Sequence, residues 1–176
     1  LPFTSEEIWQ YVPSEMKTEE SVHLTTWLQM PKEGIDKSLD NLWDGQLMKV
    51  RSELLKVLEE SRKNGIIGNS LEAEVILYLA NPEIKTVLQE YKQMLPSLFI
   101  TSGVQIKDYK ANDIESSNSN PSDNILGLYI SVRKAKGIKC ARCWNYSETV
   151  GANTEYPDIC DRCVEVLRKQ KQDASC

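Results

Sequence analysis

Two Cys-x-x-Cys pairs, Cys140/Cys143 and Cys160/Cys163, constrain this chain more than any other feature of its sequence. Sixteen residues separate the pairs, a spacing typical of a four-thiolate zinc site. Each pair makes a tight turn that points two sulfurs at one centre, and two such turns supply a tetrahedron of soft ligands. Because all four ligands come from the protein, the predicted ion is one structural Zn²⁺ with no open position for a substrate.

Disulfide bonds and a redox-active Cys-x-x-Cys motif are the two alternatives for these cysteines. Disulfides are typical of small secreted proteins, whereas most of this 176-residue chain lacks cysteine and is long enough to bury a core. A redox motif needs one pair rather than two. The fifth cysteine, Cys176, lies in a polar terminal stretch and is expected to be unpaired.

Charge is distributed unevenly along the chain. The net charge is −5, which argues against indiscriminate binding to nucleic acid. Residues 1–126 carry 12 Lys and Arg against 20 Asp and Glu, while residues 127–176 carry 9 against 6. Four thiolates with one zinc ion would bring the second segment close to neutrality. Its cations therefore either compensate the zinc–thiolate charge or contact phosphate.

Helical patterns come first in the chain. Thr4 and Glu7 form a capping box for a helix that ends near Pro13. Apolar residues recur at spacings of three and four through residues 36–64, which predicts one long amphipathic helix that ends at Asn64-Gly65. This stripe is typical of a helical bundle.

The pattern then changes to short strands around one helix. Apolar residues alternate in Leu71–Leu79, Leu98–Ile106 and Leu126–Val132, which predicts three strands. Asn81-Pro82 begins a helix that should end at Pro96. Residues 111–124 are rich in Asn, Ser and Asp and are expected to form a flexible loop.

The sequence thus predicts an α+β fold in three parts. Residues 1–67 form the end of a helical bundle, residues 68–136 a small three-stranded β-α-β-β unit, and residues 137–176 a four-cysteine zinc knuckle with a short helix after Cys163. No nucleophile–base pair, phosphate-binding glycine loop or convergent carboxylate pair is found. No apolar run approaches the length of a membrane span. The start at Leu1 rather than Met indicates a segment of a longer protein.

Several blocks of sequence resemble bacterial-type isoleucyl-tRNA synthetases, in the order of that family. Leu-Pro-Phe-Thr-Ser-Glu-Glu-Ile-Trp at 1–9 resembles the anticodon-domain helix of class I synthetases, and residues 63–78 and 98–104 resemble the segments that follow it. The Cys-Ala-Arg-Cys-Trp-Asn-Tyr stretch with Ile-Cys-Asp-Arg-Cys is similar to the C-terminal zinc module of the family.

The resemblance implies a tRNA(Ile)-binding segment of an isoleucine–tRNA ligase, in which the helical part binds the anticodon stem and the zinc module reaches the loop. The catalytic motifs His-x-Gly-His and Lys-Met-Ser-Lys-Ser are absent from the chain, so ATP-dependent activation of isoleucine belongs to a catalytic core outside it. The expected protein is a monomer, either cytoplasmic in bacteria or located in a chloroplast or mitochondrion.

Four residues around the cysteines are the predicted RNA contacts: Lys139, Arg142, Trp144 and Arg162. Loop bases of RNA are bound by aromatic stacking and by Arg planes, and the metal would hold Arg142 and Trp144 rigidly. For Trp144, the alternative is packing against the α/β unit as a lid over the zinc site. For the whole module, the alternative is a zinc ribbon that binds DNA or protein, such as the finger of some DNA glycosylases.

Overall fold

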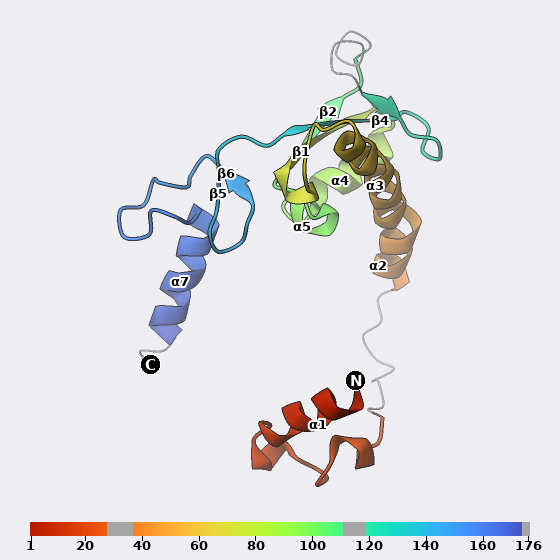
Figure 1. Cartoon of the computed structure of the whole chain (residues 1–176). Coiled ribbons are helices and arrows are strands. Elements are labelled where there is room, and N and C mark those ends of the chain that lie inside the picture. The colour runs from red at the N-terminus through yellow and green to blue at the C-terminus, as the bar shows by residue number, and fades with distance from the viewer. Residues whose placement is uncertain (28–36, 111–118, 174–176) are drawn as a thin grey trace. The chain divides into compact units, whose positions relative to one another are not determined.

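The computed structural model describes residues 1–27, 37–110 and 119–173. These form two compact units, Leu1–Asp36 and Lys37–Cys176 (Figure 1). The expected division at residues 67/68 and 136/137 stays a prediction. The described residues contain no helix that is long and apolar enough to cross a membrane.

The first unit consists of helix α1 (Pro2–Gln10) and two 3₁₀ turns, η1 (Ser14–Met16) and η2 (Val22–Leu24). The predicted capping box is wrong, because α1 begins at Pro2 with Leu1 as an N-cap that makes no side-chain cap. Proline is preorganised for the first helical position, where its missing N–H costs nothing. The helix therefore starts before Thr4 could cap it.

A long helical segment opens the second unit, as predicted for residues 36–64. It runs through α2 (Lys37–Leu42), a π-helical turn η3 (Trp43–Leu47) and α3 (Met48–Lys63). Its buried face includes Leu47, Val50, Leu54, Val57 and Leu58. Asn64 caps the helix, and Gly65 adopts φ +71°, which confirms the predicted stop.

A four-stranded sheet in the order β2-β1-β4-β3 follows the helical segment. Strand β1 (Ala73–Leu79) is parallel to β2 (Gly103–Asp108) and antiparallel to β4 (Leu128–Lys134), and the two-residue β3 (Asn120–Pro121) extends the far edge. Helices α4 (Pro82–Glu90) and α5 (Leu95–Phe99) form the crossover between β1 and β2. Both share one apolar core with α3 and the sheet.

Two details of the predicted α/β unit are wrong. Pro96 lies in the first turn of α5 instead of ending the preceding helix, which stops at Glu90. Leu98 and Phe99 therefore belong to α5, and the second strand starts only at Gly103. The short β3 adds a strand to the three that were predicted.

The polar segment 111–124 can be assessed only in part, because residues 111–118 lie outside the described residues. Its end is held in place rather than flexible. The Glu53 carboxylate of α3 accepts hydrogen bonds from the Ser122 hydroxyl (2.8 Å), the Asp123 amide (2.9 Å) and the Asn124 side chain (2.6 Å). Glu53 is only 4% exposed, so this anchor is a buried carboxylate with several donors.

Candidate zinc centre

The four cysteines lie on two turns joined to a small ribbon. Strand β5 (Ile138–Lys139) pairs with β6 (Tyr146–Ser147), and the turn between them carries the first cysteine pair. The second pair lies at the start of α7 (Asp161–Asp173). The Cys160 amide donates to the Cys140 sulfur at 3.4 Å, so one turn already contacts the other through its ligands.

The four sulfurs converge on one centre. All Sγ atoms lie within 4.8 Å of one another, with 3.8 Å between Cys140 and Cys163 and 3.7 Å between Cys143 and Cys160. A tetrahedron with Zn–S bonds of about 2.3 Å has edges of about 3.8 Å. The cysteines are free thiols, so the disulfide alternative is wrong for this structure. The donor set and its spacing fit a zinc ion.

Burial and backbone hydrogen bonds shift the pKa values of the thiols in opposite directions. Burial raises the pKa of Cys160 to about 12 and also raises that of Cys163. Burial likewise opposes ionisation of Cys140, but backbone N–H groups of Cys143, Cys160 and Arg142 outweigh it and lower its pKa to about 6. The protein alone thus stabilises the Cys140 thiolate, and a dication is needed to offset the effect of burial on the thiolates of Cys160 and Cys163.

A second, smaller core supports the cluster. Cys140, Cys160 and Cys163 are buried together with Ile159 and Val164. Val150, Tyr156 and Leu167 pack around them. This core is small for an independent fold, so the metal is expected to supply much of the stability of the module.

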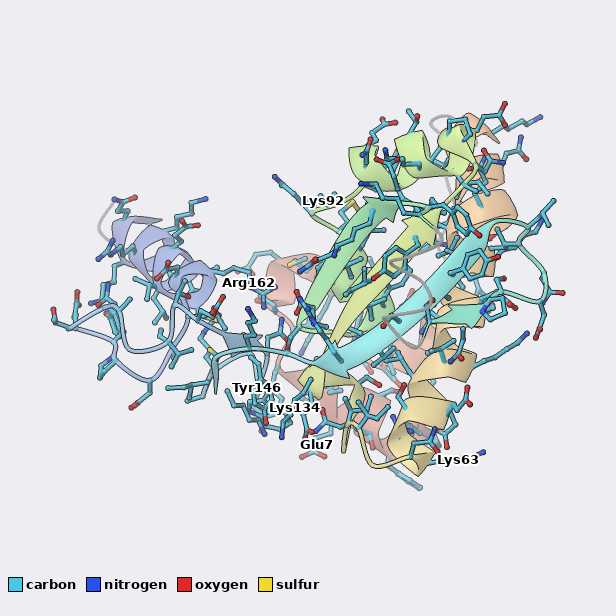
Figure 2. All side chains as sticks on the ribbon, turned by 90° about the horizontal axis from the view of Figure 1, so that it is seen from above. Glu7, Lys63, Lys92, Lys134, Tyr146 and Arg162 are labelled. Carbon is cyan, nitrogen blue, oxygen red and sulfur yellow. The ribbon has the colours of Figure 1, made fainter. Side chains whose placement is uncertain are left out.

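The predicted RNA contacts occupy different positions around the cluster. The Arg142 guanidinium donates to the Cys163 sulfur at 3.8 Å. Burial lowers the pKa of Arg162. The hydrogen bond to the Cys143 side chain and the charges of the cysteine sulfurs outweigh burial, so that the pKa of Arg162 is raised overall. Both arginines therefore compensate sulfur charge, although both remain exposed at the surface. Figure 2 shows Arg162 in the first turn of α7.

Trp144 and Lys139 form a separate pair at the surface. The Lys139 Nζ lies 5.2 Å from the centre of the Trp144 ring, within the range of a cation–π interaction. Trp144 is 59% exposed, which argues against the alternative role of a lid packed on the α/β unit. Its amide donates to the Cys140 carbonyl at 2.9 Å. This bond closes the turn and holds Trp144 at φ +67°.

Two residues that sequence reasoning missed join the ribbon to the sheet. The Ser102 hydroxyl donates to the Leu71 carbonyl and accepts from the Tyr146 amide at 2.7 Å. Gly137 has φ +88°, and a Cβ there would lie 2.2 Å from the Ser147 carbonyl carbon. Of these two residues, only Gly137 could have been recognised from the sequence, because glycine adopts positive φ values without strain. Ser102 gives no such signal, because its partner lies 44 residues away.

Two family models match separate parts of the chain. Residues 1–77 match the family model "Anticodon-binding domain of tRNA ligase", and residues 137–166 match "Zinc finger found in FPG and IleRS". The structural zinc predicted from spacing is thus supported by both the finger family and the cluster geometry.

Isoleucine–tRNA ligases of several bacteria are similar over nearly the whole chain. The Syntrophotalea carbinolica protein is 40% identical over 95% of the chain, that of Kosmotoga olearia 37% over 98%, and that of Haemophilus influenzae 40% over 94%. The chain spans only 17–18% of the length of these relatives. The chain is thus similar to a part of these isoleucine–tRNA ligases, with the anticodon-binding-domain match in residues 1–77 and the zinc-finger match in residues 137–166.

Proposed function

We propose that this chain is a tRNA-binding segment of an isoleucine–tRNA ligase and that Cys140, Cys143, Cys160 and Cys163 hold one structural zinc ion. Bound zinc would supply charge compensation for the thiolates and folding energy for the module. Residues of the chain itself, rather than the metal, then bind the tRNA. The ligase names of the relatives and the anticodon-domain match support this proposal.

The conformation of Trp144 carries the proposal. A left-handed backbone costs a residue with a side chain about 1–2 kcal/mol, and glycine avoids that cost. The turn after the first cysteine pair places a large aromatic residue there and leaves it largely exposed. Strain retained at an exposed aromatic indicates use of the side chain by a ligand.

A base stacked on Trp144 explains why an exposed tryptophan occupies a position with a left-handed backbone. Stacking of one unpaired base contributes about 1–3 kcal/mol, and loops of RNA present such bases. Lys139 covers part of the indole and adds positive charge beside it. We also propose Arg142 and Arg162 as RNA contacts, but with smaller effects, since both interact with sulfur first.

The names of the relatives support a proposal for the activity of the longer protein. We propose that the parent joins isoleucine to tRNA(Ile) with ATP bound in a catalytic core outside this chain, and that it acts as a monomer. A cytoplasmic location fits a bacterial source, and an organelle fits a targeted form. The chain itself lacks the two catalytic motifs, so its contribution is placement of the tRNA.

The alternative function is a DNA-binding zinc ribbon, since the finger model is shared with FPG. A binding comparison separates the two. The chain would be titrated with tRNA(Ile), an unrelated tRNA and duplex DNA over a range of salt concentrations. Our proposal predicts tightest binding to tRNA(Ile) and a loss of that preference when the anticodon is changed. Equal binding to all three, or a preference for duplex DNA, would favour the alternative.

A further inference from the structure

The cations around the knuckle fall into two groups in the structure. Arg133 forms an ion pair with Glu74 at 2.8 Å, and the Arg142 guanidinium donates to the Cys163 sulfur at 3.8 Å. The Lys139 ammonium lies 5.2 Å from the centre of the Trp144 ring. These three cations therefore already have a partner within the protein.

Lys134 and Lys136 form the other group. Lys134 is the last residue of β4, and Lys136 lies in the connection to the ribbon. Both side chains are exposed. Among the described residues, no carboxylate lies within 4.0 Å of either ammonium group. The two lysines, separated by Ala135, thus form no ion pair in the described part of the chain, and Lys136 acts on Glu74 only through the longer-range effect of its charge.

The backbone that carries these lysines is fixed next to the knuckle. The Ala135 amide, between them, donates to the Glu72 carbonyl at 2.7 Å. Lys136 lines a hollow of about 150 Å³ together with Tyr146 and Ser147 of the ribbon. Glu74 and Glu148 also line it, but Glu74 is already bound by Arg133 and Gln105. The hollow therefore brings Lys136 together with Tyr146, which lies two residues after Trp144 in the ribbon.

We infer that Lys134 and Lys136 bind phosphates of the RNA strand whose unpaired base stacks on Trp144. This inference rests on the proposed function and adds a site to it. Charge complementarity supports a phosphodiester as the ligand, because both exposed ammonium groups carry positive charge and a phosphodiester carries negative charge. The lysines position the strand, and Trp144 binds the base.

The salt dependence of tRNA binding tests this inference. Each phosphate contact with single-stranded nucleic acid contributes about −0.7 to the slope of log K against log salt concentration. The double variant Lys134→Gln/Lys136→Gln should therefore bind tRNA(Ile) with a slope less negative by about 1.4. Lys134→Arg/Lys136→Arg should retain the wild-type slope.

A matched control removes the same charge elsewhere. Lys92 and Lys107 are also exposed and lie outside residues 1–77, which match the anticodon-binding domain. Figure 2 shows Lys92 at an edge of the α/β unit away from Lys134. The double variant Lys92→Gln/Lys107→Gln should leave the slope unchanged. Trp144→Ala should weaken binding at every salt concentration without changing the slope, because stacking releases no counterions. Zinc content and thermal unfolding, measured for each variant, verify folding.

Two failures are distinguishable. A wild-type chain that binds tRNA(Ile) no better than an unrelated tRNA contradicts the proposed function, and the inference falls with it. A wild-type chain that prefers tRNA(Ile), combined with an unchanged slope in the Lys134/Lys136 variant or an equal change in the control, overturns the inference alone.

Discussion

At the scale of single residues, Trp144 shows how a metal site can present a side chain. Its amide donates to the Cys140 carbonyl, and its backbone adopts the left-handed conformation. Its side chain is 59% exposed. The turn that carries the first cysteine pair thus presents an aromatic side chain at the surface.

Replacing Trp144 by Gly should stabilise the zinc module by about 1 kcal/mol, because glycine adopts φ +67° without strain. Competition with a chelator would measure this as tighter zinc binding. Trp144→Ala is the matched control, since alanine removes the ring but keeps the Cβ. Equal zinc affinity in the two variants would show that the conformation is not strained.

The sequence predicted the cluster but not the surroundings of each ligand. Spacing alone brings Cys140, Cys143, Cys160 and Cys163 together, because Cys-x-x-Cys turns are local structures. The contact of Arg142 with a sulfur depends on a cysteine 21 residues away. Contacts between distant segments leave no periodic signal, so the division of the cations into two groups appears only in three dimensions.

At the scale of elements, a buried carboxylate links α3 to the segment before β4. The Lys56 ammonium at 2.7 Å, together with Asn124, Ser122 and the Asp123 amide, lowers the pKa of Glu53 to about 2, although burial opposes this. A carboxylate with a lowered folded-state pKa stabilises the fold above its unfolded-state pKa and loses this effect as the pH falls.

The stability of the α/β unit should therefore fall between about pH 5 and pH 2, where Glu53 protonates first in the unfolded chain. The contribution at neutral pH is up to about 3 kcal/mol. Chemical denaturation at several pH values would measure it. In Glu53→Gln, the unfolding free energy should be lower at neutral pH and less dependent on pH in this window. A parallel pH dependence in the two proteins would contradict the assignment.

The connection between sheet and ribbon depends on one glycine. At Gly137, a Cβ would overlap the backbone of Ser147 and Glu148. Gly137→Ala should therefore destabilise the module by about 2–4 kcal/mol, from strain and steric overlap together. Gly151→Ala is the control, since Gly151 has φ +95° but open space around it. A Gly137→Ala variant no less stable than Gly151→Ala, in thermal unfolding with zinc, would contradict this role.

Elements with a regular spacing of apolar residues were predicted well. Elements whose conformation depends on neighbouring segments were not. The long helix through residues 37–63 and the strands β1 and β4 follow from apolar spacing and are confirmed. The apolar run from Leu98 could belong to a strand or a helix, and Pro96 decides the outcome by starting α5. The two-residue β3 forms only because β4 lies beside it.

At the scale of the whole molecule, two cores within Lys37–Cys176 have different sources of stability. The α/β unit buries a large apolar cluster, whereas the zinc module relies on a few side chains around the sulfurs. Metal removal should therefore affect the two cores unequally.

Chelation of zinc, or Cys143→Ser, should unfold residues 139–167 and leave the sheet folded. Amide hydrogen exchange would show loss of protection in the module and retained protection in β1 and β4. An exchange pattern that does not change on metal removal would contradict a structural role for the ion.

In our proposal, the zinc module presents Trp144 to an unpaired base of tRNA. The most direct test is Trp144→Ala in the full-length ligase, with zinc content checked. We predict that tRNA(Ile) binding weakens by about 5- to 150-fold, equivalent to 1–3 kcal/mol, while isoleucine activation stays nearly intact. Unchanged tRNA binding, or an equal loss of activation, would contradict the account.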